Sequence, residues 1–119
     1  MTQQMRVTFE TVREIALALP GVEEGTSYGT PAFRVRGKFL ARLREDDETL
    51  VIKCDYAERD LRLEINPAAF FITDHYRGYP MLLVCLAAVE EDDLRDLLEL
   101  AWRSLAPKRL LNAIESAAD

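Results

Sequence analysis

The sequence predicts an α+β fold, a single domain spanning residues 1–119 with an antiparallel sheet of about five strands and helices on one side. Apolar residues recur at helical spacing near both ends of the chain. Residues 31–54 alternate with the period of a half-buried strand, and residues 81–86 form an unbroken apolar run. These three observations predict the element order α-β-β-β-α-β-β-α-α.

The first predicted element is a helix that runs to about Leu19. Thr8 can cap its amino terminus, and Val7 and Val12 are spaced for an apolar contact across that cap. A Pro-Gly pair at residues 20–21 then ends the helix.

Three strands are predicted between residues 26 and 54, separated by a turn at Gly37 and by the acidic run 45–48. Apolar residues alternate with basic ones along the first two strands, which is typical of a sheet with one face on the core. The positions assigned to the core face are Phe33, Val35, Phe39, Ala41, Leu43, Leu50, Ile52 and Cys54.

The second half of the chain predicts a helix, two strands and two further helices. Asp55 can cap a helix that ends near Ile65, before a proline. Residues 70–72 and 81–86 then form strands, of which the second is apolar on both faces and so central. Helices follow over residues 91–105 and from Pro107, the last one carrying Leu110, Leu111 and Ile114.

Composition limits the classes of function. The net charge of −6 weakens attraction to phosphate backbones, although residues 31–54 hold six cations against four acids. No segment is apolar enough for a signal peptide or a membrane span, so we expect a cytoplasmic protein without a membrane partner. In that setting Cys54 and Cys85 are expected to be reduced thiols.

The basic residues of the strand region form the main candidate site. If the hairpin forms, their side chains project from one surface, where arginine can grip phosphate with two hydrogen bonds. The alternative is a solvated face whose charges prevent edge pairing. The residues concerned are Arg34, Arg36, Lys38, Arg42 and Arg44.

A second cluster of polar side chains lies in "TDHYRGYP", residues 73–80, which holds the one histidine of the chain. Its flanks predict a turn between two strands, so His75 is a turn residue, a ligand contact or a catalytic base. No serine stands in a nucleophile motif and no pair has metal-ligand spacing, which favours a protein that is not an enzyme and has no metal or cofactor. The candidate ligand contacts are Tyr28, His75, Tyr76 and Tyr79, with Arg77 beside them.

Four stretches, "LALPGVEE", "YGTPAFRVRGKFLARL", "HYRGYPMLLVCL" and "LLELAWRSLAPKRL", resemble the MmcQ/YjbR family of small bacterial proteins over residues 8–112. The resemblance implies a fold related to the secretion-chaperone-like group and a double-wing arrangement of strands that is often labelled DNA-binding. The wing strands would be those that carry the five cations, and residues 75–79 fall on the family's histidine–tyrosine stretch.

The sequence therefore predicts a non-enzymatic binding module. The leading ligand is DNA, bound by the basic strand face with Arg77 and the tyrosines at its margin. A protein-interaction or self-associating module is the alternative, and a third is a small-molecule site around His75.

Overall fold

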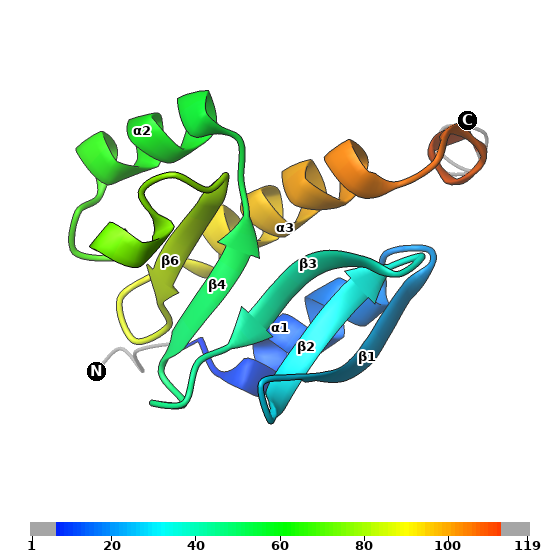
Figure 1. The fold of residues 1–119 in the computed structure, drawn as a ribbon, viewed down its shortest axis with the longest axis horizontal. Coiled ribbons are helices and arrows are strands. Elements are labelled where there is room, and N and C mark those ends of the chain that lie inside the picture. The colour runs from blue at the N-terminus through cyan, green and yellow to red at the C-terminus, as the bar shows by residue number, and fades with distance from the viewer. Residues whose placement is uncertain (1–6, 113–119) are drawn as a thin grey trace, which may run out of the picture.

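The computed structural model describes residues 7–112, which form a six-stranded antiparallel sheet with helices packed against one face (Figure 1). The spatial order is β1-β2-β3-β4-β6-β5, so β6 lies inside the sheet, as its apolar run predicts. The predicted α+β architecture is confirmed. The strands are β1 (Val22–Ser27), β2 (Thr30–Val35), β3 (Lys38–Leu43), β4 (Thr49–Lys53), β5 (Phe70–Phe71) and β6 (Met81–Cys85).

The sixth strand is the edge strand β1, which the sequence pattern does not reveal. None of its residues is buried, so it has no alternation between a core face and a solvent face. Glutamate and glycine are also poor strand formers. The strand forms because it pairs with β2 along its whole length, from Val22 opposite Val35 to Ser27 opposite Thr30.

The helices are α1 (Phe9–Leu17), α2 (Tyr56–Ile65) and α3 (Glu91–Leu105), with a 3-10 turn η1 (Asp74–Tyr76) before β6. Helix α1 ends two residues before the predicted Leu19, and α2 and α3 agree with prediction. Residues 108–112 are helical, while Ile114 of the predicted last helix lies outside the described residues. Within residues 7–112, no helix has the length and apolar character needed to cross a membrane.

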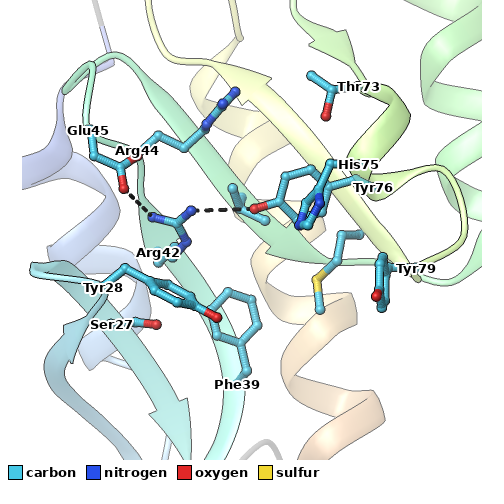
Figure 2. Close-up of a pocket in the computed structure, with 12 residues that line it drawn as sticks. Ser27, Tyr28, Phe39, Arg42, Arg44, Glu45, Thr73, His75, Tyr76 and Tyr79 are labelled. Carbon is cyan, nitrogen blue, oxygen red and sulfur yellow. Dashed lines mark hydrogen bonds and ion pairs between the residues drawn. The ribbon is translucent and has the colours of Figure 1, made fainter.

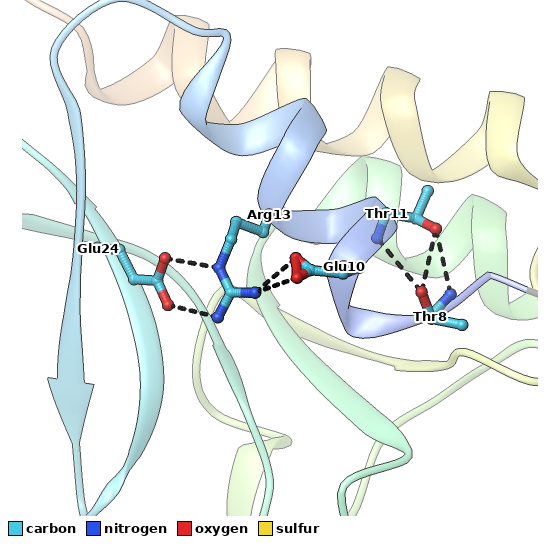
Figure 3. Close-up of polar contacts among 5 residues, drawn as sticks. All are labelled: Thr8, Glu10, Thr11, Arg13 and Glu24. Carbon is cyan, nitrogen blue, oxygen red and sulfur yellow. Dashed lines mark hydrogen bonds and ion pairs between the residues drawn. The ribbon is translucent and has the colours of Figure 1, made fainter.

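Helix α1 is held at its start and along its side (Figure 3). The Thr8 side chain accepts from the Thr11 backbone N–H, and the Thr11 hydroxyl accepts from the Thr8 backbone N–H, which completes a reciprocal cap. Arg13 donates to both oxygens of Glu24 on β1, at 2.8 and 2.9 Å, and also binds Glu10. The hydrogen bond from Arg13 holds the pKa of Glu24 below its usual value of 4.5.

The core lies between the sheet and the helices α1 and α3 (Figure 1). Burying one large apolar side chain contributes about 1.5–3 kcal/mol. Trp102 of α3 is fully buried, and its indole Nε1 donates to the Pro20 carbonyl at 2.7 Å, which fixes the turn after α1 against α3. Among the largest buried side chains are Phe33, Leu40, Leu50, Ile52, Phe70, Leu82, Leu94, Leu97 and Leu98.

Candidate functional site

A groove of about 720 Å³ lies on the face of the sheet that points away from the core (Figure 2). Strand register places Arg42 opposite Ala32 on one side and Val51 on the other, and Val51 opposite Leu83. These residues alternate with the core positions of the same strands and so share the outer face. The turn between β1 and β2 forms one wall of the groove, and the segment from Thr73 to Met81 forms the other.

Arg42 lies at the floor of this groove and is only 8% exposed. Its guanidinium donates to Thr30 Oγ1 at 3.3 Å, to the Leu43 carbonyl at 3.4 Å and to the Tyr76 hydroxyl at 3.4 Å. The carboxylate of Glu45 is 3.8 Å away. N–H···O hydrogen bonds are usually about 2.9–3.0 Å long, and those from a charged N–H to an anionic oxygen about 2.7–2.9 Å, so every one of these contacts is long. The guanidinium can therefore accept a closer, negatively charged partner.

The first wall carries Tyr28 at the tip of the β1–β2 hairpin. Tyr28 has φ 54° and Gly29 has φ 80°, the left-handed pair that a two-residue turn between twisted strands requires. This turn leaves Tyr28 85% exposed, with its ring centroid 5.2 Å from the Cζ atom of Arg42. Phe39 of β3 lies below Tyr28 and lines the same wall (Figure 2).

The second wall is aromatic as well. The His75 ring meets the Tyr76 ring edge-on, with 4.8 Å between their centroids, and lies 6.0 Å from the Tyr79 ring. Tyr76 is half-buried, whereas His75 and Tyr79 are exposed at the rim. The two walls therefore present flat aromatic surfaces on either side of a cation (Figure 2).

Helix α2 holds the second wall in place. Arg59 is 8% exposed and donates to the backbone carbonyls of Arg77 and Tyr79, both at 3.1 Å. The Tyr56 hydroxyl donates to the Gly78 carbonyl at 2.9 Å. Three consecutive carbonyls of the wall are thus bound by one face of α2, which fixes the position of the rim.

The acidic turn between β3 and β4 borders the groove. Asp46 accepts from the backbone N–H groups of Glu48 and Thr49, both at 2.9 Å, and from the Thr49 hydroxyl at 2.8 Å. These hydrogen bonds, chiefly the one from Glu48, hold the pKa of Asp46 below its usual value of 3.8. The ordered turn brings Arg44 and Glu45 to the rim, where they place one charge of each sign beside Arg42.

The five cations of β2 and β3 do not share one surface, contrary to the expectation from their spacing. Phe33 pairs with Ala41 and Arg34 pairs with Phe39, so Leu40 is an extra residue in β3 and forms a β-bulge. A bulge exchanges the faces of the residues beyond it. Leu40 is therefore in the core, and Phe39, which strand alternation predicts on the core face, lines the groove.

The remaining basic residues lie away from the groove. Lys38 pairs with Val35, whose side chain is in the core, so Lys38 is on the opposite face from Arg42. Arg36 occupies the β2–β3 turn with φ 51°. Arg34 shares the outer face but extends toward the sheet edge, where it donates to the Thr26 carbonyl at 3.3 Å.

Arg77 is exposed and pairs with Asp74 at 2.8 Å, outside the groove lining. The groove nevertheless brings together six of the residues singled out from the sequence, and adds others that the spacing did not identify. The six are Tyr28, Arg42, Arg44, His75, Tyr76 and Tyr79, and the additions are Ser27, Phe39, Glu45, Val51, Thr73 and Met81. Glu45 directly follows Arg44 and lies three positions after Arg42, a spacing visible in the sequence, whereas the place of Phe39 depends on the bulge and has no such signal.

The side chains of the groove can bind a negatively charged group next to aromatic rings. Across the described part of the chain, no three histidine, cysteine or acidic side chains are grouped so as to hold a metal ion. Cys54 is buried and Cys85 is partly buried, and both are free thiols. Burial raises the pKa of Cys54 to about 12, and it lies outside the groove lining.

The fold resembles a solved structure. The crystal structure of Deinococcus radiodurans protein DR2400, assigned to the family domain DUF419, superposes with a TM-score of 0.70. The match covers 85% of this chain and 80% of the other, at 20% sequence identity. At that identity the likeness concerns the fold alone.

Sequence comparison leads to a family. Uncharacterized protein Mb2600 of Mycobacterium bovis and uncharacterized protein Rv2570 of Mycobacterium tuberculosis are each 47% identical over 48 residues. That stretch is 40% of this chain, and it spans 37% of the length of each relative. The YjbR family model matches residues 17–104, which include the whole sheet and most of α3. The chain therefore belongs to the YjbR family.

Proposed function

We propose that this protein is a non-enzymatic binding module whose groove takes an anionic ligand, with Arg42 as the anchor. The observation that carries the proposal is a nearly buried guanidinium with contacts of 3.3 Å or longer at the floor of a groove. Burying a charge without close partners costs free energy, and an anion with two acceptor oxygens offsets that cost. The proposal keeps the predicted small-molecule site around His75 and moves its centre to Arg42.

Thermal unfolding with sulfate in place of chloride, at constant ionic strength, tests this proposal. Sulfate stabilises folded proteins in general because it is excluded from their surface, and specific binding to the folded state raises Tm further, so sulfate should raise the Tm of the wild type more than that of Arg42→Gln. Arg95→Gln is the matched control, because Arg95 is an exposed arginine on α3 that pairs with Glu91 at 2.9 Å. Arg42→Lys keeps the charge but lacks the planar fork and should lose most of the effect. An equal rise in the wild type and Arg42→Gln would contradict the proposal.

Nucleic acid is the second candidate ligand, and single strands fit better than a duplex. Only three of the five cations, Arg34, Arg42 and Arg44, lie on the outer face, which reduces the common surface on which a duplex would lie. An exposed Tyr28 above Arg42, with Arg34 further along the same face, favours a single strand with a stacked base. Fluorescence anisotropy of oligo(dT) across a salt series tests this candidate: no binding at micromolar protein, or binding unchanged by Arg42→Gln, would exclude it.

Self-association stays a prediction, favoured by the edge strand β1. Glu24 and Thr26 pair with β2 at positions without backbone hydrogen bonds and so direct their N–H and C=O groups outward, although the Thr26 carbonyl already accepts from Arg34. Light scattering over a concentration series tests it, and a strictly monomeric protein would count against it.

A cytoplasmic location also stays a prediction, which fractionation of cells tests.

A further inference from the structure

We infer that the groove binds a compact aromatic acid, a flat ring whose carboxylate or phosphate is attached directly or through one or two bonds. This inference rests on the proposed anion site at Arg42 and narrows its ligand class. It follows from where the charge, the rings and the apolar floor lie relative to one another.

The acid group is assigned to Arg42 by charge and by hydrogen-bond capacity. An arginine side chain carries five N–H donors, and those of Arg42 that are engaged reach a hydroxyl or a carbonyl at 3.3–3.4 Å. The other nearly buried arginine, Arg59, binds two carbonyls at 3.1 Å and does not line the groove. Arg44 at the rim supplies a second cation on the approach to Arg42.

The ring is assigned by the aromatic groups that surround the same guanidinium. The Tyr28 centroid is 5.2 Å from Arg42 Cζ, and the Tyr76 hydroxyl is 3.4 Å from its Nη2. An acid bound to Arg42 therefore begins between Tyr28 and Tyr76, and whatever is attached to it lies against these rings (Figure 2). Offset or edge-on contacts between rings favour an aromatic body over a saturated one of the same size.

The floor and the volume limit the shape of the ligand. Val51 lies beside Arg42 in the sheet but is only 1% exposed, whereas Phe39 and Met81 line the groove and are partly exposed. The exposed apolar surface of Phe39 and Met81 can contact the face of one ring. The volume of about 720 Å³ leaves room for substituents toward Thr73 and His75, which can hydrogen-bond to a hydroxyl or a ring nitrogen.

A nucleotide fits this arrangement less well. Its base is separated from its phosphate by a sugar, so a phosphate on Arg42 would carry its own base past Tyr28 and Tyr76, and a base stacked on Tyr28 would have to belong to a neighbouring nucleotide of a strand. The short distance between cation and rings instead requires that the acid and the ring of the ligand be neighbours. The structure therefore favours an aromatic acid over a nucleoside monophosphate.

Titrations followed by residue-resolved NMR test the inference with a matched set of probes. Benzoate supplies ring and charge, cyclohexanecarboxylate has the charge without the ring, and benzamide has the ring without the charge. Comparison of phenyl phosphate with benzoate shows whether the groove prefers a phosphate or a carboxylate. Adenosine monophosphate tests whether it prefers a nucleotide. All titrations use the full chain at constant ionic strength, with Arg42→Gln and Tyr28→Leu as variants and Arg95→Gln as the control.

Benzoate or phenyl phosphate should bind about fivefold more tightly than cyclohexanecarboxylate, with shifts confined to groove residues. Benzamide should bind at least about tenfold more weakly than benzoate, because it lacks the charge that pairs with Arg42. Tyr28→Leu should remove the preference for the ring while retaining binding of the acid.

Equal affinity for benzoate and cyclohexanecarboxylate at Arg42 would overturn the inference and leave the anion site standing. Tighter binding of adenosine monophosphate or oligo(dT) than of benzoate would overturn it in favour of nucleic acid. Absence of binding by sulfate and by all the probes would overturn the proposed function itself.

Discussion

The Nη2 atom of Arg42 lies 3.4 Å from the hydroxyl oxygen of Tyr76, a residue 34 positions later in the chain. This contact joins the floor of the groove on β3 to its second wall at η1. Because Arg42 also lies under the ring of Tyr28, one side chain contacts both walls. A ligand that engages Arg42 therefore meets both walls at once.

Glu45 is expected to compete with the ligand for Arg42, since its carboxylate is 3.8 Å from Nη1 of that arginine. Glu45→Gln should increase affinity for benzoate by about threefold, the size expected for an exposed ion pair. Glu48→Gln is the control, because Glu48 is exposed on the same turn and does not line the groove. NMR titration measures both affinities, and equal effects of the two variants would argue against direct competition.

Arg59 is expected to support the second wall without touching the ligand. Arg59→Met removes the donors to the carbonyls of Arg77 and Tyr79 and should lower the free energy of unfolding by about 1–3 kcal/mol. It should also weaken benzoate binding, because the rim at Tyr79 loses its attachment. Urea denaturation and NMR titration measure the two effects. Arg103→Met, at an exposed ion pair on α3, should change neither, and a stable Arg59→Met protein with unchanged affinity would refute this role.

Trp102→Phe tests the contact between α3 and the turn after α1. The substitution removes the donor to the Pro20 carbonyl and leaves a small void, so the free energy of unfolding should fall by about 2–4 kcal/mol. Chemical denaturation followed by circular dichroism measures the change. Tyr56→Phe, which loses the hydrogen bond of a partly exposed hydroxyl to the Gly78 carbonyl, should cost about 1 kcal/mol or less. A loss below 1 kcal/mol in Trp102→Phe would show that the contact is unimportant for stability.

Asp46 should make stability depend on pH in the acid range. Its pKa is held below the usual 3.8 in the folded state by hydrogen bonds from Glu48 and Thr49. The ionised group thus stabilises the fold above pH 3.8, and this contribution is lost as the pH falls through the lower folded-state pKa. Asp46→Asn should reduce the slope of stability against pH between about pH 5 and 3, measured by urea denaturation at each pH. An unchanged slope would mean that other carboxylates, such as Glu24, dominate acid unfolding.

The sequence predicts the fold well where burial on one face imposes a period. The stripe of α3, the central strand β6 and the caps at Thr8 and Asp55 all agree with the structure. It fails at β1, where neither face is buried and pairing with β2 alone defines the strand.

The groove could be predicted only in part. The tyrosines, His75 and Arg42 were recognisable as candidate contacts, but strand alternation assumed an unbroken register. Because of the bulge at Leu40, Phe39 lies on the outer face of the sheet and Lys38 on the core face, the reverse of the prediction. No residue type near Leu40 predicts a bulge. A one-residue insertion in a strand pairing depends on the packing of Leu40 into the core, which is a tertiary effect.

The most direct test of the anion site is the Nε–Hε resonance of Arg42, followed by NMR during a benzoate titration at constant ionic strength. Substitution by lysine assigns the peak, and the corresponding resonance of Arg34, on the same face but outside the groove lining, is the internal reference. A saturable shift of the Arg42 resonance with an unmoved Arg34 resonance is the predicted result. An unmoved Arg42 resonance, or equal and unsaturated shifts at both arginines, would contradict the assignment of Arg42 as the anchor of a ligand.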